Sequence, residues 1–149
     1  MSAKKLYIVC SLLIFNLLPK SFICGSELDL ILHGGYAFSS FEGQKSTAVY
    51  ITMINNSQKP IDILGLNTDI AKKAEFHDII EEGNIVKMKK INKLIIKKGE
   101  TFFFQPGGKH IMLFGLNKRL KDKEKFLIFF ETSDKKNISA EITVIDRTQ

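Results

Sequence analysis

The chain of 149 residues contains only two cysteines, Cys10 and Cys24, and both lie in its first 26 residues. The rest of the sequence has no thiol, which excludes a cysteine nucleophile, a thiol redox couple, a zinc ribbon and an iron–sulfur site. It also lacks a Gly-rich phosphate-binding loop and any familiar Ser-His-acid spacing. We therefore expect that the protein is not an enzyme.

The first 26 residues have the pattern of a signal peptide. Two lysines precede an apolar run at 6–18, which is too short to span a bilayer comfortably. Small residues follow and would allow cleavage before Glu27, with an uncleaved anchor as the alternative. Ile23 stands where a lipoprotein signal needs Gly, Ala or Ser, so plain export is favoured over lipidation at Cys24. We expect export to the periplasm.

Removal of the signal peptide leaves one domain, residues 27–149, with a weak positive charge. It has 19 lysines and arginines against 16 acids, because three of the 22 basic residues lie in the removed segment. So mild an excess does not favour nucleic acid as a partner. About 123 residues suffice for a single core. We expect a monomer that meets the membrane only through its signal peptide or membrane-bound partners.

The domain is predicted to be all-β. Short runs rich in Ile, Val, Leu and aromatic residues alternate with turn clusters, which is typical of a sandwich or barrel. The runs are LDLILH (28–33), TAVYITMI (47–54), IDILGL (61–66), EFHDII (75–80), IVKMKK (85–90), KLIIKK (93–98), TFFF (101–104), KHIMLF (109–114), KFLIFFE (125–131) and ISAEITVI (138–145). Only TDIAKKAE (68–75) is compatible with a helix, of at most two turns.

The stretch QPGGKHIMLFGL places a histidine and a methionine two positions apart on a predicted strand, at His110 and Met112. Residues two apart on a strand point to the same face. Ile111 and Leu113 point the other way and make a natural core face. The pair is therefore expected to face outward or into a rim, although a buried methionine beside a satisfied histidine is the alternative.

A second pair lies upstream, on either side of the predicted hairpin turn EEGN (81–84). If all four residues form the loop, or if Glu82 and Gly83 form a tight turn, His77 lies directly opposite Met88. Opposed residues in an antiparallel pair share one face. A turn centred on Gly83 and Asn84 would instead pair His77 with Lys90. The first register is the favoured one.

Two imidazoles and two thioethers form a donor set with a clear preference among metals. A thioether sulfur is a soft, neutral donor that suits Cu(I) and has little affinity for zinc, calcium or magnesium. Cu(II) prefers harder nitrogen and oxygen donors. The two pairs therefore predict a Cu(I) site.

The spacing of the four residues resembles that of the periplasmic copper chaperones called PCuAC. Ten residues separate His77 from Met88, and twenty-one more precede His110-Ile111-Met112. The surrounding segments are also similar to the family: EFHDIIEEGNIVKMKK, QPGGKHIMLFGLNKRLK, TAVYITMINNS and GGYAF. The resemblance covers roughly residues 33–145.

This resemblance implies a cupredoxin-like Greek-key β-barrel or sandwich with one Cu(I) site. By resemblance, its ligands are His77, Met88, His110 and Met112. It implies a chaperone that delivers copper to the CuA centre of cytochrome c oxidase subunit II, with Sco-type copper proteins as further partners. The rival interpretation is an exported β-sandwich that docks on an envelope partner without metal. Exposure separates the two, because structural methionines would be buried while copper ligands would converge at a rim.

Four other residues receive an expected role. Phe114 shares the outward face of His110 and is predicted to shield copper from water. His33 is expected at the surface and Met53 in the core. Glu75, with other acids near His77, could offer oxygen ligands to a harder metal, but is expected to keep a turn soluble.

Overall fold

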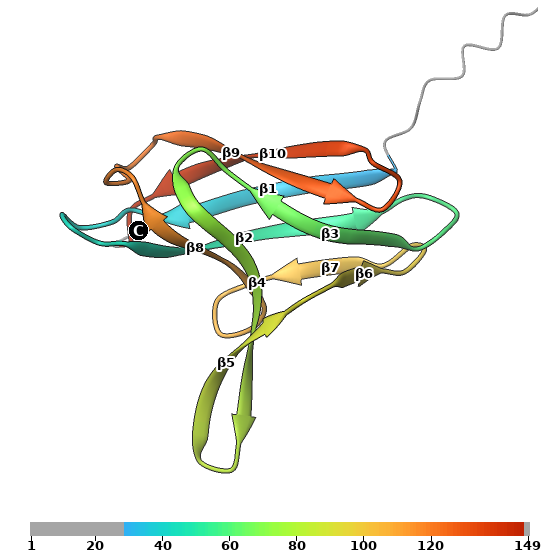
Figure 1. Ribbon diagram of the computed structural model, residues 1–149, viewed down its shortest axis with the longest axis horizontal. Coiled ribbons are helices and arrows are strands. Elements are labelled where there is room, and N and C mark those ends of the chain that lie inside the picture. The colour runs from blue at the N-terminus through green and yellow to red at the C-terminus, as the bar shows by residue number, and fades with distance from the viewer. Residues whose placement is uncertain (1–28, 148–149) are drawn as a thin grey trace, which may run out of the picture.

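The computed structural model describes residues 29–147, and the predicted signal peptide lies outside them. The described chain forms ten strands (Figure 1). They are β1 (Leu30–Phe38), β2 (Ser46–Asn55), β3 (Ile61–Asn67), β4 (Ala71–Glu82), β5 (Ile85–Ile91), β6 (Leu94–Ile96), β7 (Thr101–Phe104), β8 (His110–Leu116), β9 (Lys125–Thr132) and β10 (Asn137–Ile145). In this part of the chain no helix is long and apolar enough to cross a membrane.

The strands join into one mixed sheet in the order β5-β4-β8-β2-β1-β10-β9-β3-β6, with β7 paired to β2. Only the β1–β10 pair, among those described, is parallel. The sheet turns back on itself, so that β9 and β10 lie over β2 and β8 (Figure 1). The predicted all-β sandwich is confirmed.

The segment 68–75 does not form the short helix that its sequence allowed. Residues 69–70 make a turn, and β4 begins at Ala71. A helix of two turns is marginal on its own, because nucleation costs more than so few hydrogen bonds return. Instead, β4 pairs with β8 from its first residue, where Ala71 lies opposite Leu116. This pairing satisfies the hydrogen-bonding groups of the backbone.

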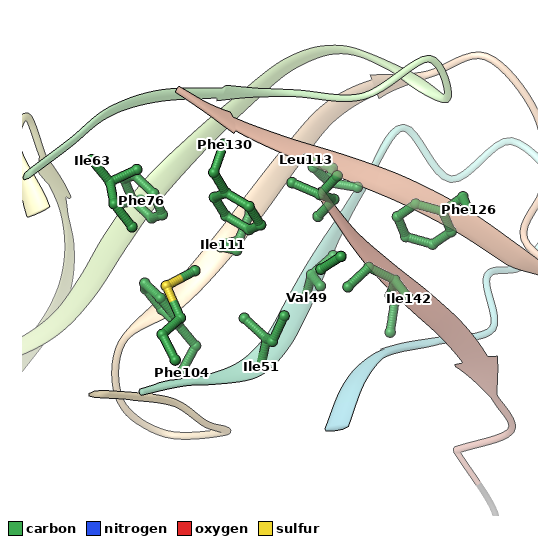
Figure 2. Packing of buried hydrophobic residues seen from close by; sticks show 14 of the residues in the cluster. Val49, Ile51, Ile63, Phe76, Phe104, Ile111, Leu113, Phe126, Phe130 and Ile142 are labelled. Atoms are coloured by element: carbon green, nitrogen blue, oxygen red, sulfur yellow. The ribbon is translucent and has the colours of Figure 1, made fainter. Parts of the chain in front are cut away.

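The core lies between the two layers of the folded sheet. Figure 2 shows Ile111 and Leu113 of β8 reaching into the space shared with Phe130 of β9 and Ile142 of β10. The side chains of Ile111 and Leu113 are fully buried. The apolar face predicted for β8 is therefore the core face, which places His110 and Met112 on the opposite side of the strand.

A pair of glycines interrupts the pairing of β1 with β2. The register of β1 against β2 shifts between His33 and Tyr36, where Gly34 has a φ of 66°. A side chain at Gly35 would stand 2.6 Å from Ile142 Cδ1 and 3.0 Å from a backbone oxygen of β10. A larger residue here would force Ile142 or the backbone of β10 to shift, so glycine favours this close approach between β1 and β10.

The β4–β5 hairpin extends away from the body of the molecule (Figure 1). Its strands pair Glu82 with Ile85, so the loop is the two-residue turn Gly83-Asn84. The favoured prediction, which set His77 directly opposite Met88, is wrong. His77 pairs with Lys90, as in the alternative register, and Met88 pairs with Ile79.

The turn chemistry explains this register. Gly83 has a φ of 65°, and glycine at the first central position is the signature of a two-residue type II′ hairpin. Relative to the favoured prediction, the partner of His77 moves by two residues along β5, from Met88 to Lys90. Because the side-chain period of a strand is two, His77 and Met88 still share a face.

Candidate metal centre

The two histidines of the predicted site lie directly opposite each other on neighbouring strands. His77 of β4 pairs with His110 of β8, and their ring centroids are 5.9 Å apart. Both rings are largely covered, with 8% of His77 and 6% of His110 exposed. The sequence placed each histidine on a strand but did not predict this direct pairing.

The Pro-Gly-Gly turn before β8 sets the orientation of the His110 ring. Gly108 N donates to Gln105 O at 3.1 Å and closes the turn. Its own carbonyl oxygen lies 3.0 Å from His110 Nδ1. A carbonyl only accepts, so Nδ1 carries the proton in this bond. In the neutral ring Nε2 keeps its lone pair, and Nε2 lies 3.2 Å from Met88 Sδ.

His77 is oriented by a carboxylate on its own strand. Its Nε2 lies 3.0 Å from Glu75 Oε2. Because an ionised carboxylate only accepts, Nε2 is the donor, and Nδ1 of the neutral ring keeps its lone pair. In the described part of the chain, His77 Nδ1 is the buried side-chain nitrogen or oxygen without a hydrogen-bond partner. Such an orphaned polar atom calls for a ligand or another functional explanation.

Glu75 itself is the centre of a charged network. Its Oε1 accepts from Lys73 Nζ at 2.8 Å and from Lys90 Nζ at 2.6 Å. The hydrogen bonds from Lys73, then Lys90 and His77, lower the pKa of Glu75 from 4.5 to about 2. The expectation that Glu75 keeps a turn soluble is wrong, because its carboxylate is 8% exposed and lies within β4. Its position two residues before His77 was the sequence signal that both share a face.

The two methionines differ in exposure. Met88 lies on the edge strand β5 and is 52% exposed, although its sulfur contacts His110. Met112 is half-buried on β8, where it stands opposite Glu75 on one side and Ala48 on the other. Met112 therefore shares the face of both histidines. Neither methionine belongs to the buried core, in contrast to Met53, which is fully buried as predicted.

The Phe114 ring lies beside that of His77. It follows Met112 on the same face of β8, and its ring centroid lies 5.8 Å from that of His77. Lys73 Nζ lies 5.9 Å from the centroid of the Phe114 ring. The half-buried Phe114 ring therefore lies next to the His77 ring, in a position compatible with the predicted shielding role.

The remaining charged side chains near the histidines pair at the surface. Asp78 lies 3.0 Å from Lys109, and Glu82 lies 2.7 Å from Lys87. His33 is exposed, as expected. Within residues 29–147, no three His, Cys, Asp or Glu side chains form a group that could hold a metal.

The family comparison covers most of the described chain. The family model described as "Putative lipoprotein LpqE-like" matches residues 30–144. Uncharacterized protein RP573 of Rickettsia prowazekii is 27% identical over 100 residues, which is 65% of this chain. The matched part spans 55% of the length of that relative.

Solved structures share the fold. The solution structure of CuI-DR1885 from Deinococcus radiodurans is 27% identical, with a TM-score of 0.66 and 84% of each chain covered. The copper-bound PCuAC domain from PmoF2 has a TM-score of 0.67 over 80% of this chain and 94% of its own. At 13% sequence identity, the similarity to this domain shows a shared fold and nothing more. The resemblance to PCuAC proteins predicted from the sequence is confirmed.

Proposed function

We propose that this protein is an exported Cu(I) chaperone. The chain belongs to the LpqE-like family and has the fold of PCuAC domains. Copper is its cargo, which it binds and passes on without changing it chemically. The likeness to a protein solved in its Cu(I)-bound form supports this function. Export to the periplasm follows from the predicted signal peptide and is part of the proposal.

We assign the cargo to His77, Met88, His110 and Met112. The observation that carries this assignment is the state of the two imidazoles. His77 Nδ1 is buried without a partner, and His110 Nε2 faces Met88 Sδ at 3.2 Å with no hydrogen between them in the neutral ring. Unpartnered imidazole nitrogens of neighbouring rings suit a cation, and sulfur with imidazole suits Cu(I). Met112 joins them because it shares their face.

The exposure of the ligands suggests how the cargo leaves. Cu(I) accepts low coordination numbers, so a donor from the acceptor can bind while one chaperone ligand departs. Met88 is the ligand that an acceptor reaches most easily, because it is half-exposed on the edge strand of a projecting hairpin. The covered histidines would then hold the ion until exchange is complete.

By the PCuAC resemblance, we propose cytochrome c oxidase subunit II as the acceptor, at its CuA site. Sco-type copper proteins are further candidates for the exchange. Ligand exchange with such proteins requires direct contact at the exposed side of the site. A transfer assay from the Cu(I)-loaded chaperone to the soluble domain of subunit II tests this part of the proposal.

A Cu(I) competition titration against a chromophoric chelator, without oxygen, tests the binding function. We expect the mature protein to take one equivalent of Cu(I) and the Met88→Leu/Met112→Leu variant to lose it. Met53→Leu provides a matched control, because that methionine lies in the core. If the unmutated protein cannot compete for Cu(I), the copper function fails. The docking module without metal then becomes the better interpretation.

A further inference from the structure

Glu75 is buried at the metal centre, yet the proposed ligand set does not include it. A carboxylate that is 8% exposed needs strong partners, because burial of an unpaired charge is costly. Here the partners are two lysines on one oxygen and one imidazole on the other. Both oxygens of Glu75 are therefore engaged by donors on the chain itself.

The position of Glu75 determines which nitrogen His77 can offer. The carboxylate accepts a hydrogen bond from Nε2–H, so the lone pair of the neutral ring is on Nδ1. That atom is the one that is buried without a partner. Metal-bound histidines commonly donate their second ring N–H to a carboxylate or a carbonyl, which fixes the tautomer and the ring orientation. The carbonyl of Gly108 has the same relation to His110.

The two lysines hold Glu75 in this place. Lys73 lies two residues before it on β4, and Lys90 lies on β5, directly opposite His77. Lys90 is also two residues from Met88, so its bond to Glu75 ties the strand of the sulfur ligand to the strand of the histidine. Since Oε1 accepts from both lysines, the carboxylate is neutralised locally and is a poor oxygen ligand for a cation.

We propose that Glu75 is a positioning residue, which acts through His77 and presents Nδ1 of that ring to the cargo. This inference rests on the proposed Cu(I) function, and it adds a residue that sets the geometry of the same site. Glutamine at this position keeps an oxygen that can accept from Nε2 but loses the negative charge. Alanine loses the acceptor itself. The two substitutions therefore separate positioning from charge.

The experiment combines two measurements on the mature protein, purified after export. Nitrogen-15 spectra of the imidazoles in the metal-free protein report the tautomer of His77. Cu(I) competition reports affinity. We expect the unmutated protein and Glu75→Gln to keep the Nε2–H tautomer, with a loss of less than about 10-fold in affinity for the glutamine variant. Glu75→Ala should give mixed tautomers and a loss of about 10- to 100-fold, which is typical for removal of a group behind a metal ligand.

Glu82→Ala is the matched control, because Glu82 lies on the same strand and also pairs with a lysine of β5. It should change neither measurement. An Nδ1–H tautomer in the unmutated protein, or equal losses in Glu75→Gln and Glu75→Ala, would overturn the positioning role while Cu(I) binding stands. Failure of the unmutated protein to bind Cu(I) would overturn the function and this inference together.

Discussion

His77 of β4 stands directly opposite His110 of β8, with 5.9 Å between their ring centroids. Directly opposed residues in an antiparallel pair share a face, so the backbone ladder rather than a loop fixes the relation of the two rings. Each ring is further held by an acceptor, Glu75 or the Gly108 carbonyl. The imidazole half of the site is therefore preorganised, while Met88 reaches it from a projecting hairpin.

We expect the two histidines to act as one unit in binding. His77→Ala and His110→Ala should each weaken Cu(I) binding by more than the 10- to 100-fold typical of a group behind a ligand. The double variant should lose much less than the product of the two single losses, because residues of one site are not additive. Chelator competition measures all three, with His33→Ala as an exposed control. Fully multiplicative losses would argue against a shared ion.

Substitution of the exposed methionine should separate binding from stability. Met88→Leu keeps the volume but removes the sulfur that lies 3.2 Å from His110 Nε2. We expect a large loss of Cu(I) affinity with a change below about 0.5 kcal/mol in the free energy of unfolding, as for other surface sites. Urea unfolding and Cu(I) competition give the two values. If Met53→Leu, a core substitution, weakened copper binding equally, the sulfur of Met88 would have no special role.

Much of this centre could be predicted from the sequence, because its patterns are local. The alternation His110, Ile111, Met112 has the period of a strand, so the core face and the opposite face of β8 followed directly. The pairing of His77 with His110 joins strands far apart in the chain, and no local turn sets its register. The hairpin register depended on whether Gly83 stands first or second in the turn. Spacing alone does not decide that, whereas the pairing of Glu82 with Ile85 in the structure does.

Ionised Glu75 should stabilise the folded protein at neutral pH, and this contribution should be lost in acid. The hydrogen bonds from Lys73, Lys90 and His77 lower the pKa of Glu75 from 4.5 to about 2 in the folded state. A depressed carboxyl pKa stabilises the fold above the unfolded pKa, and this contribution is lost as the pH falls from about 4.5 towards about 2.

Urea unfolding of metal-free Glu75→Gln at several pH values tests this contribution. The variant should be less stable at pH 7, and the difference from the unmutated protein should shrink below pH 4.5. Glu82→Gln, which removes an exposed ion pair, should cost less than about 1 kcal/mol. A Glu75→Gln difference that stays constant down to pH 2 would contradict the assignment, because a pH-independent effect has no link to this carboxyl.

The ring of Phe114 should control how fast the cargo leaves. It lies 5.8 Å from the His77 ring. We expect it to cover a flank that would otherwise admit water or a competing ligand. We expect Phe114→Ala to release Cu(I) to a chelator faster, while the fold persists because this side chain lies outside the buried core. Stopped-flow transfer to the chelator measures the rate, and Phe103→Ala is an exposed aromatic control. An unchanged rate would mean that the ring packs beside the site without shielding it. Access would then be governed by Met88 on the open side, because that proposed ligand is the exposed one.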